Sequence, residues 1–226
     1  VMPVDLDPFG IIKKIEHLIK NERKRFRYFV NQIAGNKNVE ERANIEMGIS
    51  GGIELYNLSK IMRHWIELIK QTKSYQIALI IQMQIPLVER IAKSLFKGTK
   101  ALTKGQPIGD GIGPYFVAKL IEKNDRIKEI AEDTIAVEKK VFGKKTIILK
   151  AKGPGGRIGR LEKALEIISR KNKIAKIITI DAAAKLEGEK TGSVAEGVGV
   201  AMGGIGAERS RIEDIAVKND IPIDSI

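Results

Sequence analysis

Glycine is distributed unevenly along this chain of 226 residues, and its distribution restricts the folds that the chain can form. Of the 22 glycines, 17 lie at or after Gly98, where they separate short apolar runs. Glycine between a strand and a helix lets backbone N–H groups converge on a ligand. We therefore expect a helical region over residues 1–104, followed over residues 105–226 by an α/β domain with glycine-rich loops. Its alternating pattern predicts three αβα layers around a mostly parallel sheet.

The apolar runs of the second half give the predicted strands. KIAKIITID at 173–181 is nearly continuous, as is typical of a strand buried on both faces. TIAVEKKVF at 134–142 and KTIILKAK at 145–152 predict two more strands, separated by the turn signal Gly143-Lys144. The terminal run IPIDSI predicts a strand that is cut short, and the chain starts at Val1 instead of methionine. We therefore expect a piece of a longer protein.

The formal net charge is +12, with a pI near 9.7. The first 105 residues carry 18 Lys and Arg against 10 Asp and Glu, so the excess is concentrated there. Such a charge favours an anionic partner, either nucleic acid or a membrane surface. The amphipathic basic helix predicted over 11–33 would suit a membrane surface, or it would pack on its own domain. The abundance of Ile, Lys and Glu also predicts a heat-adapted source.

Several classes of site are disfavoured by the composition. The chain has no cysteine, which excludes disulfides, thiolate catalysis and cysteine-ligated zinc. Its two histidines, His17 and His64, lack the spacing of metal ligands, and no dinucleotide-binding glycine motif occurs. We therefore expect neither a metal nor a cofactor. No apolar run approaches the ~18 residues of a membrane span, and no signal peptide is evident. These features predict a cytoplasmic protein, with membrane association through helix 11–33 as an alternative.

Two aspartates occupy positions that suit acid–base chemistry. Asp110 lies in GDGIGP, and Asp181 ends the run IITI before three alanines. A carboxylate at the carboxyl end of a buried strand faces the crevice where α/β sheets bind ligands. If the two side chains converge, they can divide the roles of acid and base and activate water against an amide carbonyl. The alternative is structural: Asp110 caps the helix at Pro114, and Asp181 terminates a strand.

A glycine-rich loop with basic residues provides a candidate anion site. It reads KGPGGRIGR at 152–160 and leads into a predicted helix, whose first amides favour a phosphate or carboxylate. It is not a Walker A motif, because no GK[ST] follows the glycines. The alternative is a tight turn with exposed basic side chains. The predicted anion-binding residues are Lys152, Gly153, Gly155, Gly156, Arg157, Arg160 and, from a later helix, Arg209.

The motifs of residues 107–226 resemble those of the spore germination protease and the hydrogenase-maturation endopeptidases. The matching segments are Asp110–Pro114, Gly153–Arg160, Ile180–Ala182, and Gly204–Gly206 followed by Arg209 and Arg211. The resemblance implies an αβα fold with catalytic carboxylates at Asp110 and Asp181. Two features depart from it: no apolar strand precedes Asp110, and no histidine follows His64 to complete a metal site. The whole chain is also similar to an uncharacterised archaeal, membrane-associated family.

The sequence thus leaves hypotheses from different classes. The first is a peptidase-like hydrolase that acts on a peptide or protein through Asp110 and Asp181, with Lys152 and the glycine amides stabilising the oxyanion. The second is a non-catalytic module that binds an anionic ligand or RNA through its basic residues. The third is a membrane-proximal scaffold whose glycine loops only close turns. The oligomeric state is not indicated by any of these patterns.

Overall fold

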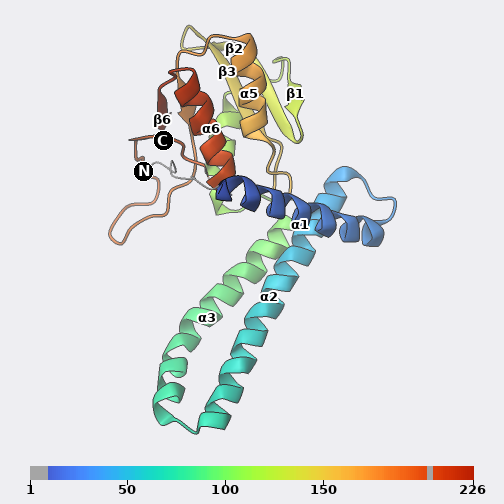
Figure 1. The fold of residues 1–226 in the computed structure, drawn as a ribbon, viewed down its shortest axis with the longest axis vertical. Coiled ribbons are helices and arrows are strands. Elements are labelled where there is room, and N and C mark those ends of the chain that lie inside the picture. The colour runs from blue at the N-terminus through green and yellow to red at the C-terminus, as the bar shows by residue number, and fades with distance from the viewer. Residues whose placement is uncertain (1–9, 203–205) are drawn as a thin grey trace. The chain divides into compact units, whose positions relative to one another are not determined.

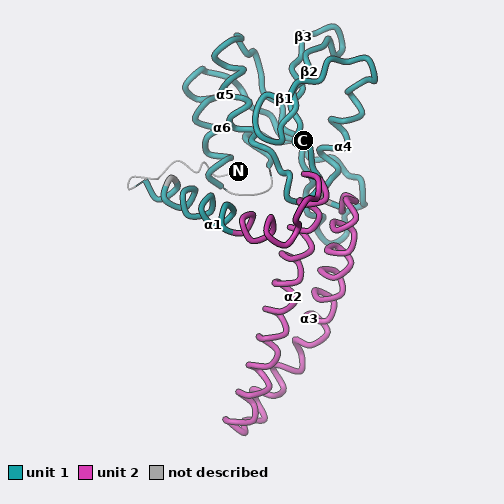
Figure 2. The backbone as a smooth tube through the Cα atoms, turned by 90° about the vertical axis from the view of Figure 1, so that its right-hand side faces the viewer, with its two compact units in different colours: residues 1–25, 109–226 teal, residues 26–108 magenta. Residues whose placement is uncertain are grey.

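The computed structural model describes residues 10–202 and 206–226, which form two compact units (Figure 2). Unit 1 comprises residues 1–25 and 109–226, and unit 2 comprises residues 26–108. Helix α1 (Ile11–Ala34) passes from the first unit into the second. None of the helices in the described part of the chain combines the length and the apolar character needed to cross a membrane.

Unit 2 is dominated by an antiparallel hairpin of two long helices, α2 (Val39–Thr72) and α3 (Tyr75–Leu102), visible in Figure 1. Both helices begin with polar caps. Asn38 accepts a hydrogen bond from the Glu41 N–H and the Glu41 carboxylate accepts one from the Asn38 N–H, which forms a capping box. The Ser74 hydroxyl accepts from the Ile77 N–H at 3.3 Å. These caps satisfy amides that have no partner within their own helix.

The two helices of the hairpin meet along a heptad-like seam. The less exposed residues recur at alternating spacings of three and four, as expected where a coiled-coil seam faces its partner. In α2 they include Gly51, Leu55, Leu58, Met62, Trp65 and Ile69, and in α3 Ile81, Val88, Ala92, Leu95, Thr99 and Leu102. A Cβ at Gly51 would lie 2.0 Å from Thr99 Oγ1. Gly48 and Gly51 therefore permit close packing, and α2 continues through them.

Unit 1 contains a three-stranded antiparallel sheet in the order β1-β2-β3. Its strands are β1 (Lys128–Ala131), β2 (Thr134–Val141) and β3 (Lys144–Ala151). Helix α5 (Leu161–Lys171) packs against all three strands, and the short helix α4 (Ile112–Lys119) packs against β3. Val137 and Ile148, which are paired in register, are buried and form part of the apolar face of the sheet.

A second small sheet lies in the same unit. Strand β4 (Ile177–Thr179) pairs in parallel with β6 (Ile223–Ser225), and β5 (Gly197–Val198) pairs with β6 in the antiparallel sense. Helix α6 (Gly206–Lys218) precedes β6 and packs against α5. The apolar core of this region is formed by residues of α5, α6, β6 and the segments next to them. It consists of Leu165, Val200, Ile212, Ala216, Ile221 and Ile223.

The prediction of three αβα layers around a mostly parallel sheet is wrong. The structure contains a helical N-terminal part, a small antiparallel sheet and a mixed sheet with a single parallel pair. One reason lies in the connection between β2 and β3, which consists of only Phe142 and Gly143. A connection this short can join only antiparallel strands, because parallel strands need a long crossover. The second reason is that KIAKIITID forms a strand of only three residues.

Candidate functional site

The backbone of the Asp110 segment approaches the strand end that carries Asp181. Asp110 lies in the short 3₁₀ turn Gly109–Gly111, which leads directly into α4. Three residues later, a Cβ at Gly113 would lie 2.3 Å from the Ile180 carbonyl oxygen and 3.0 Å from the Asp181 Cα. Residues three apart in a helical turn are separated by roughly 5 Å. The fold therefore brings the Asp110 turn and the Asp181 strand end together, although the Asp110 side chain lies outside the described residues.

Asp181 is held at the edge of the mixed sheet. Its N–H donates to the Ile226 carbonyl at 3.0 Å, which continues the parallel pairing of β4 and β6 beyond the strand. Its Oδ1 accepts a hydrogen bond from the Ala182 N–H at 2.8 Å. The side chain is partly buried, and the chain after Ala182 is exposed through residue 198. The carboxylate is thus fixed by its own backbone beside a long exposed segment.

The basic side chains of the 152–160 loop contact carboxylates of the protein itself. Lys152 pairs with Glu129 at 2.5 Å, and Arg157 Nε donates to Asp133 Oδ1 at 3.0 Å. Arg160 Nε donates to Glu162 Oε1 at 2.7 Å. The hydrogen bond from Lys152 holds the pKa of Glu129 below its ordinary value. An external anion at this loop would therefore have to compete with three internal carboxylates.

The glycines of this loop mainly serve its backbone geometry. Gly153 and Gly155 have φ angles of 53° and 66°, and the Gly153 N–H donates to the Arg157 carbonyl at 2.9 Å. Gly156 is partly buried in the same turn. At Gly159, with φ of 74°, a Cβ would lie 2.6 Å from Thr134 Oγ1. The loop is consequently closed on itself and seated against the buried Thr134.

Arg209, the last predicted anion ligand, also interacts within the protein. Its Nη2 donates to the Met202 carbonyl at 2.6 Å, whereas its buried Nε has no hydrogen-bond partner among the described residues. Gly204 and Ile205, which carried part of the peptidase resemblance, lie outside the described residues. Within residues 10–202 and 206–226, no group of three or more His, Asp or Glu side chains is arranged to hold a metal ion.

Two family models together match nearly the whole chain. The model described as "Protein of unknown function (DUF1512) N-terminal domain" matches residues 1–105. The model described as "Domain of unknown function (DUF1512) C-terminal" matches residues 108–226. The chain belongs to the DUF1512 family. Neither the curated proteins nor the solved structures gave a match. The likeness to the two peptidase families and the archaeal, heat-adapted source therefore stay predictions.

Unit 1 contains a buried carboxylate cluster that sequence reasoning missed. Glu162 is 2% exposed and Glu16, in α1, is 7% exposed. Glu16 Oε2 accepts from Arg211 Nη2 at 2.6 Å, whereas Glu162 Oε2 has no hydrogen-bond partner among the described residues. Glu16, Glu162 and Arg211 line a cavity of about 750 Å³ together with Glu166, Asp214 and Lys218.

The pKa values of Glu16 and of Glu208, a residue in the first turn of α6, shift in opposite directions. Burial raises the pKa of Glu16, but the hydrogen bonds and charges of Lys20 and Arg211 outweigh it, so the net shift is downward. Burial raises the pKa of Glu208, and the negative charge of Glu162 raises it further. The sequence does contain a signal for Glu162, since it lies three and six residues before the buried Leu165 and Ile168 of α5. A charged residue on an apolar helix stripe indicates a buried ion.

Proposed function

We propose that the DUF1512 C-terminal domain is an aspartate-dependent hydrolase of amide bonds, with Asp110 and Asp181 as its catalytic carboxylates. The observation that carries this proposal is the close approach of Gly113 to Ile180 and Asp181. It brings together two segments that are far apart in the sequence, and this supports a site shared by the two aspartates. A side chain at position 113 would prevent it, because the nearest atoms are backbone.

The reaction follows the ordinary chemistry of two carboxyl groups. One carboxylate takes a proton from water while the water oxygen bonds to the amide carbonyl carbon. The other, protonated at the start, donates its proton to the leaving nitrogen as the C–N bond breaks. The exposed segment after Ala182 leaves the strand end open to a peptide substrate. Lys152, the predicted oxyanion contact, pairs with Glu129, so we assign the oxyanion no side chain.

The rival hypothesis of an anion site in the 152–160 loop has less support. The three cations that would bind the anion already contact Glu129, Asp133 and Glu162. Membrane association through the basic helix 11–33 is supported only by apolar residues that are exposed on that helix, such as Ile11, Leu18 and Ile33. Both stay predictions from the sequence alone.

Hydrolysis is tested with two substrates, a fluorescently labelled casein and a mixed peptide library whose products are read by mass spectrometry. We expect turnover by the unaltered chain, and loss of turnover in both Asp110→Asn and Asp181→Asn. The matched control is Asp220→Asn, because Asp220 is exposed and its φ of 51° is one that asparagine tolerates. This control should retain activity.

Unfolding curves of each variant separate a lost catalytic group from a lost fold. Absence of cleavage by the unaltered chain at any pH between about 4 and 9 would reject the proposal, since that range spans the acid and base forms of a carboxyl pair. Full activity in folded Asp181→Asn would reject the residue assignment.

A further inference from the structure

The turn between β2 and β3 places a bulky aromatic residue at an unfavourable backbone position. Val141 pairs with Lys144, so Phe142 and Gly143 alone form the connection. Their φ angles are 49° and 77°. Two-residue hairpin turns with positive φ at both central positions strongly prefer Asn-Gly. A large side chain in the left-handed region is strained, so phenylalanine is a costly choice here.

Packing does not compensate for this strain. Phe142 is 97% exposed, the largest exposed fraction among the large apolar residues that the structure describes. The ring therefore contributes almost no buried surface to the fold. A strained residue that brings no structural gain indicates a role in function.

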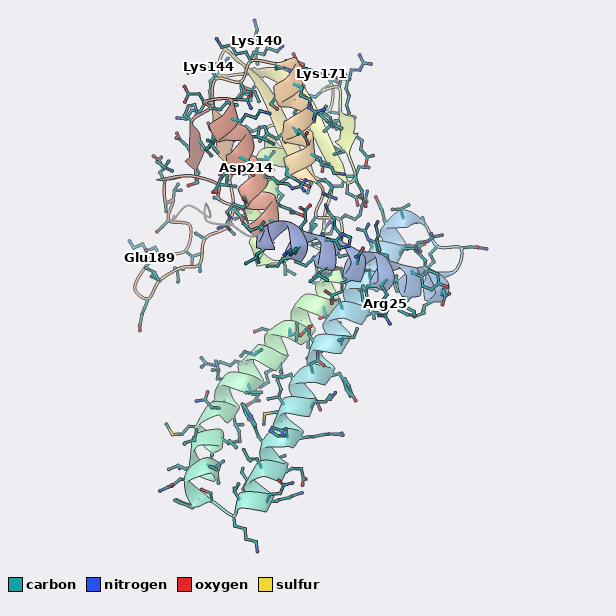
Figure 3. All side chains as sticks on the ribbon, viewed as in Figure 1. Arg25, Lys140, Lys144, Lys171, Glu189 and Asp214 are labelled. Carbon is teal, nitrogen blue, oxygen red and sulfur yellow. The ribbon has the colours of Figure 1, made fainter. Side chains whose placement is uncertain are left out.

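The lysines around the turn add a second feature that disfavours the isolated fold. Lys140 lies directly opposite Lys145 in the register, where like charges destabilise a sheet. Lys145 reaches Glu138 at 2.6 Å, but both side chains are exposed and such pairs contribute little. Lys140 and Lys144 have no salt-bridge partner among the described residues, and Figure 3 shows both at the end of unit 1 formed by this turn. Lys171, in the last turn of α5, lies at the same end (Figure 3).

We propose that this turn binds single-stranded nucleic acid. A base would stack on the exposed Phe142 ring, and Lys140, Lys144 and Lys145 would contact the phosphates on either side. An anionic strand would remove the repulsion between Lys140 and Lys145, and the ring would gain the contact that the fold denies it. The net charge of +12 acts in the same direction over a longer range.

The composition of the turn favours nucleic acid over a membrane surface. Insertion into a bilayer interface depends on the apolar area that becomes buried. Here one ring is exposed, its apolar neighbour Val141 is only partly exposed, and lysines occupy the adjacent positions. One exposed ring is sufficient to stack on one base, whereas it offers little apolar area to a bilayer.

The experiment measures fluorescence anisotropy of a labelled, mixed-sequence RNA of about 12 nucleotides, long enough for one binding site. We expect Phe142→Asn to weaken binding roughly 10-fold, within the range measured for the loss of one stacked base. Its dependence on salt should stay unchanged, since no charge is removed. Phe142→Trp should bind as tightly as the unaltered chain, whereas Phe142→Leu should bind as weakly as Phe142→Asn.

The phosphate contacts are tested separately through the salt dependence. Replacing Lys140, Lys144 and Lys145 by Gln should reduce the slope of log K against log salt by roughly 2, given about 0.7 for each phosphate contact to a single strand. The matched control replaces three exposed lysines elsewhere in the unit, Lys163, Lys185 and Lys190, by Gln. This control removes the same charge and should leave the slope of log K against log salt nearly unchanged.

Three results would overturn the proposal. The first is no binding by the unaltered chain, and the second is an equal effect of the two triple variants. The third has two parts. The unaltered chain and Phe142→Leu both bind vesicles of about four parts phosphatidylcholine to one part phosphatidylserine, and no Phe142 variant changes RNA binding. The proposal is independent of the hydrolase, so Asp181→Asn should bind RNA as the unaltered chain does.

Discussion

Two basic turns of unit 1 have similar sequences and opposite surroundings. The 152–160 loop and the 139–145 turn each combine lysine or arginine with glycine. In the first, Lys152, Arg157 and Arg160 contact internal carboxylates. In the second, Lys139 and Lys145 also contact internal carboxylates, but Lys140 and Lys144 have no salt-bridge partner among the described residues, and Phe142 is exposed. The second turn therefore presents lysines whose charge the described part of the protein leaves without a counter-charge, and the first turn does not.

The largest expected effect is a difference in stability loss when one glycine of each turn is replaced by alanine. Gly159 and Gly143 have nearly the same φ, 74° and 77°, but only Gly159 has atoms in the space that a Cβ would occupy. Gly159→Ala should lower the free energy of unfolding by about 3 kcal/mol, because strain and overpacking add. Gly143→Ala should cost about 1 kcal/mol from the backbone alone. Denaturant unfolding measures both; equal losses would mean that the loop does not rest on Thr134.

The next effect concerns the cations. The Arg157 and Asp133 side chains are 12% and 17% exposed. Arg157→Gln should therefore lower the free energy of unfolding by about 2 kcal/mol, since it leaves a largely buried carboxylate without its charged donor. Lys144→Gln should change it by less than about 0.5 kcal/mol. If both variants unfold alike, the contrast between the two turns has no energetic basis.

The third prediction concerns the pH dependence of stability, which Glu208 near the buried carboxylate cluster should affect. The pKa of Glu208 is raised in the folded state, so the folded chain keeps a proton that the unfolded chain loses above about pH 4.3. Stability should therefore fall as the pH rises from there to the raised pKa. Glu208→Gln should remove this slope and gain stability relative to the unaltered chain at neutral pH.

The control for this measurement is Glu129, whose pKa is lowered by the hydrogen bond from Lys152. Its contribution to stability is present above the ordinary glutamate pKa and is lost as the pH falls through the lower, folded value. Glu129→Gln should consequently lose stability at neutral pH, the opposite sign. Unfolding curves at several pH values would contradict the assignment if both variants shifted in the same direction.

Local patterns predicted the elements of this fold better than their assembly. The helix predicted to follow the 152–160 loop is α5 (Leu161–Lys171), and strands β2 and β3 were predicted to within a residue or two. The sequence also predicts that the helix at Pro114 runs to about residue 131. This prediction is wrong, because α4 ends at Lys119 and β1 follows. A continuous parallel sheet was inferred from apolar runs, but apolar runs do not specify which edges pair.

The sequence predicted that the backbone segments of the candidate site would lie close together, but it did not predict the side-chain contacts around them. The Gly113 contact places the Asp110 and Asp181 segments together, and the tight turn in GDGIGP was a signal for it. The pairing of Arg157 with Asp133 could not be foreseen, because the partners are 24 residues apart and meet through the β1–β2 connection. Phe142 was assigned to a strand, so its exposure was not expected.

The smallest expected effect is a change in the free energy of unfolding when the strained residue Phe142 is replaced. Phe142→Asn places the residue that this turn type favours at a φ of 49°, and should raise the free energy of unfolding by roughly 1 kcal/mol. Phe142→Ala retains a Cβ without the ability to hydrogen-bond locally, so it should leave stability nearly unchanged. Thermal unfolding compares the three chains. A loss of stability in both variants would mean that the ring supports the fold, and the argument from strain to nucleic-acid binding would then lose its first step.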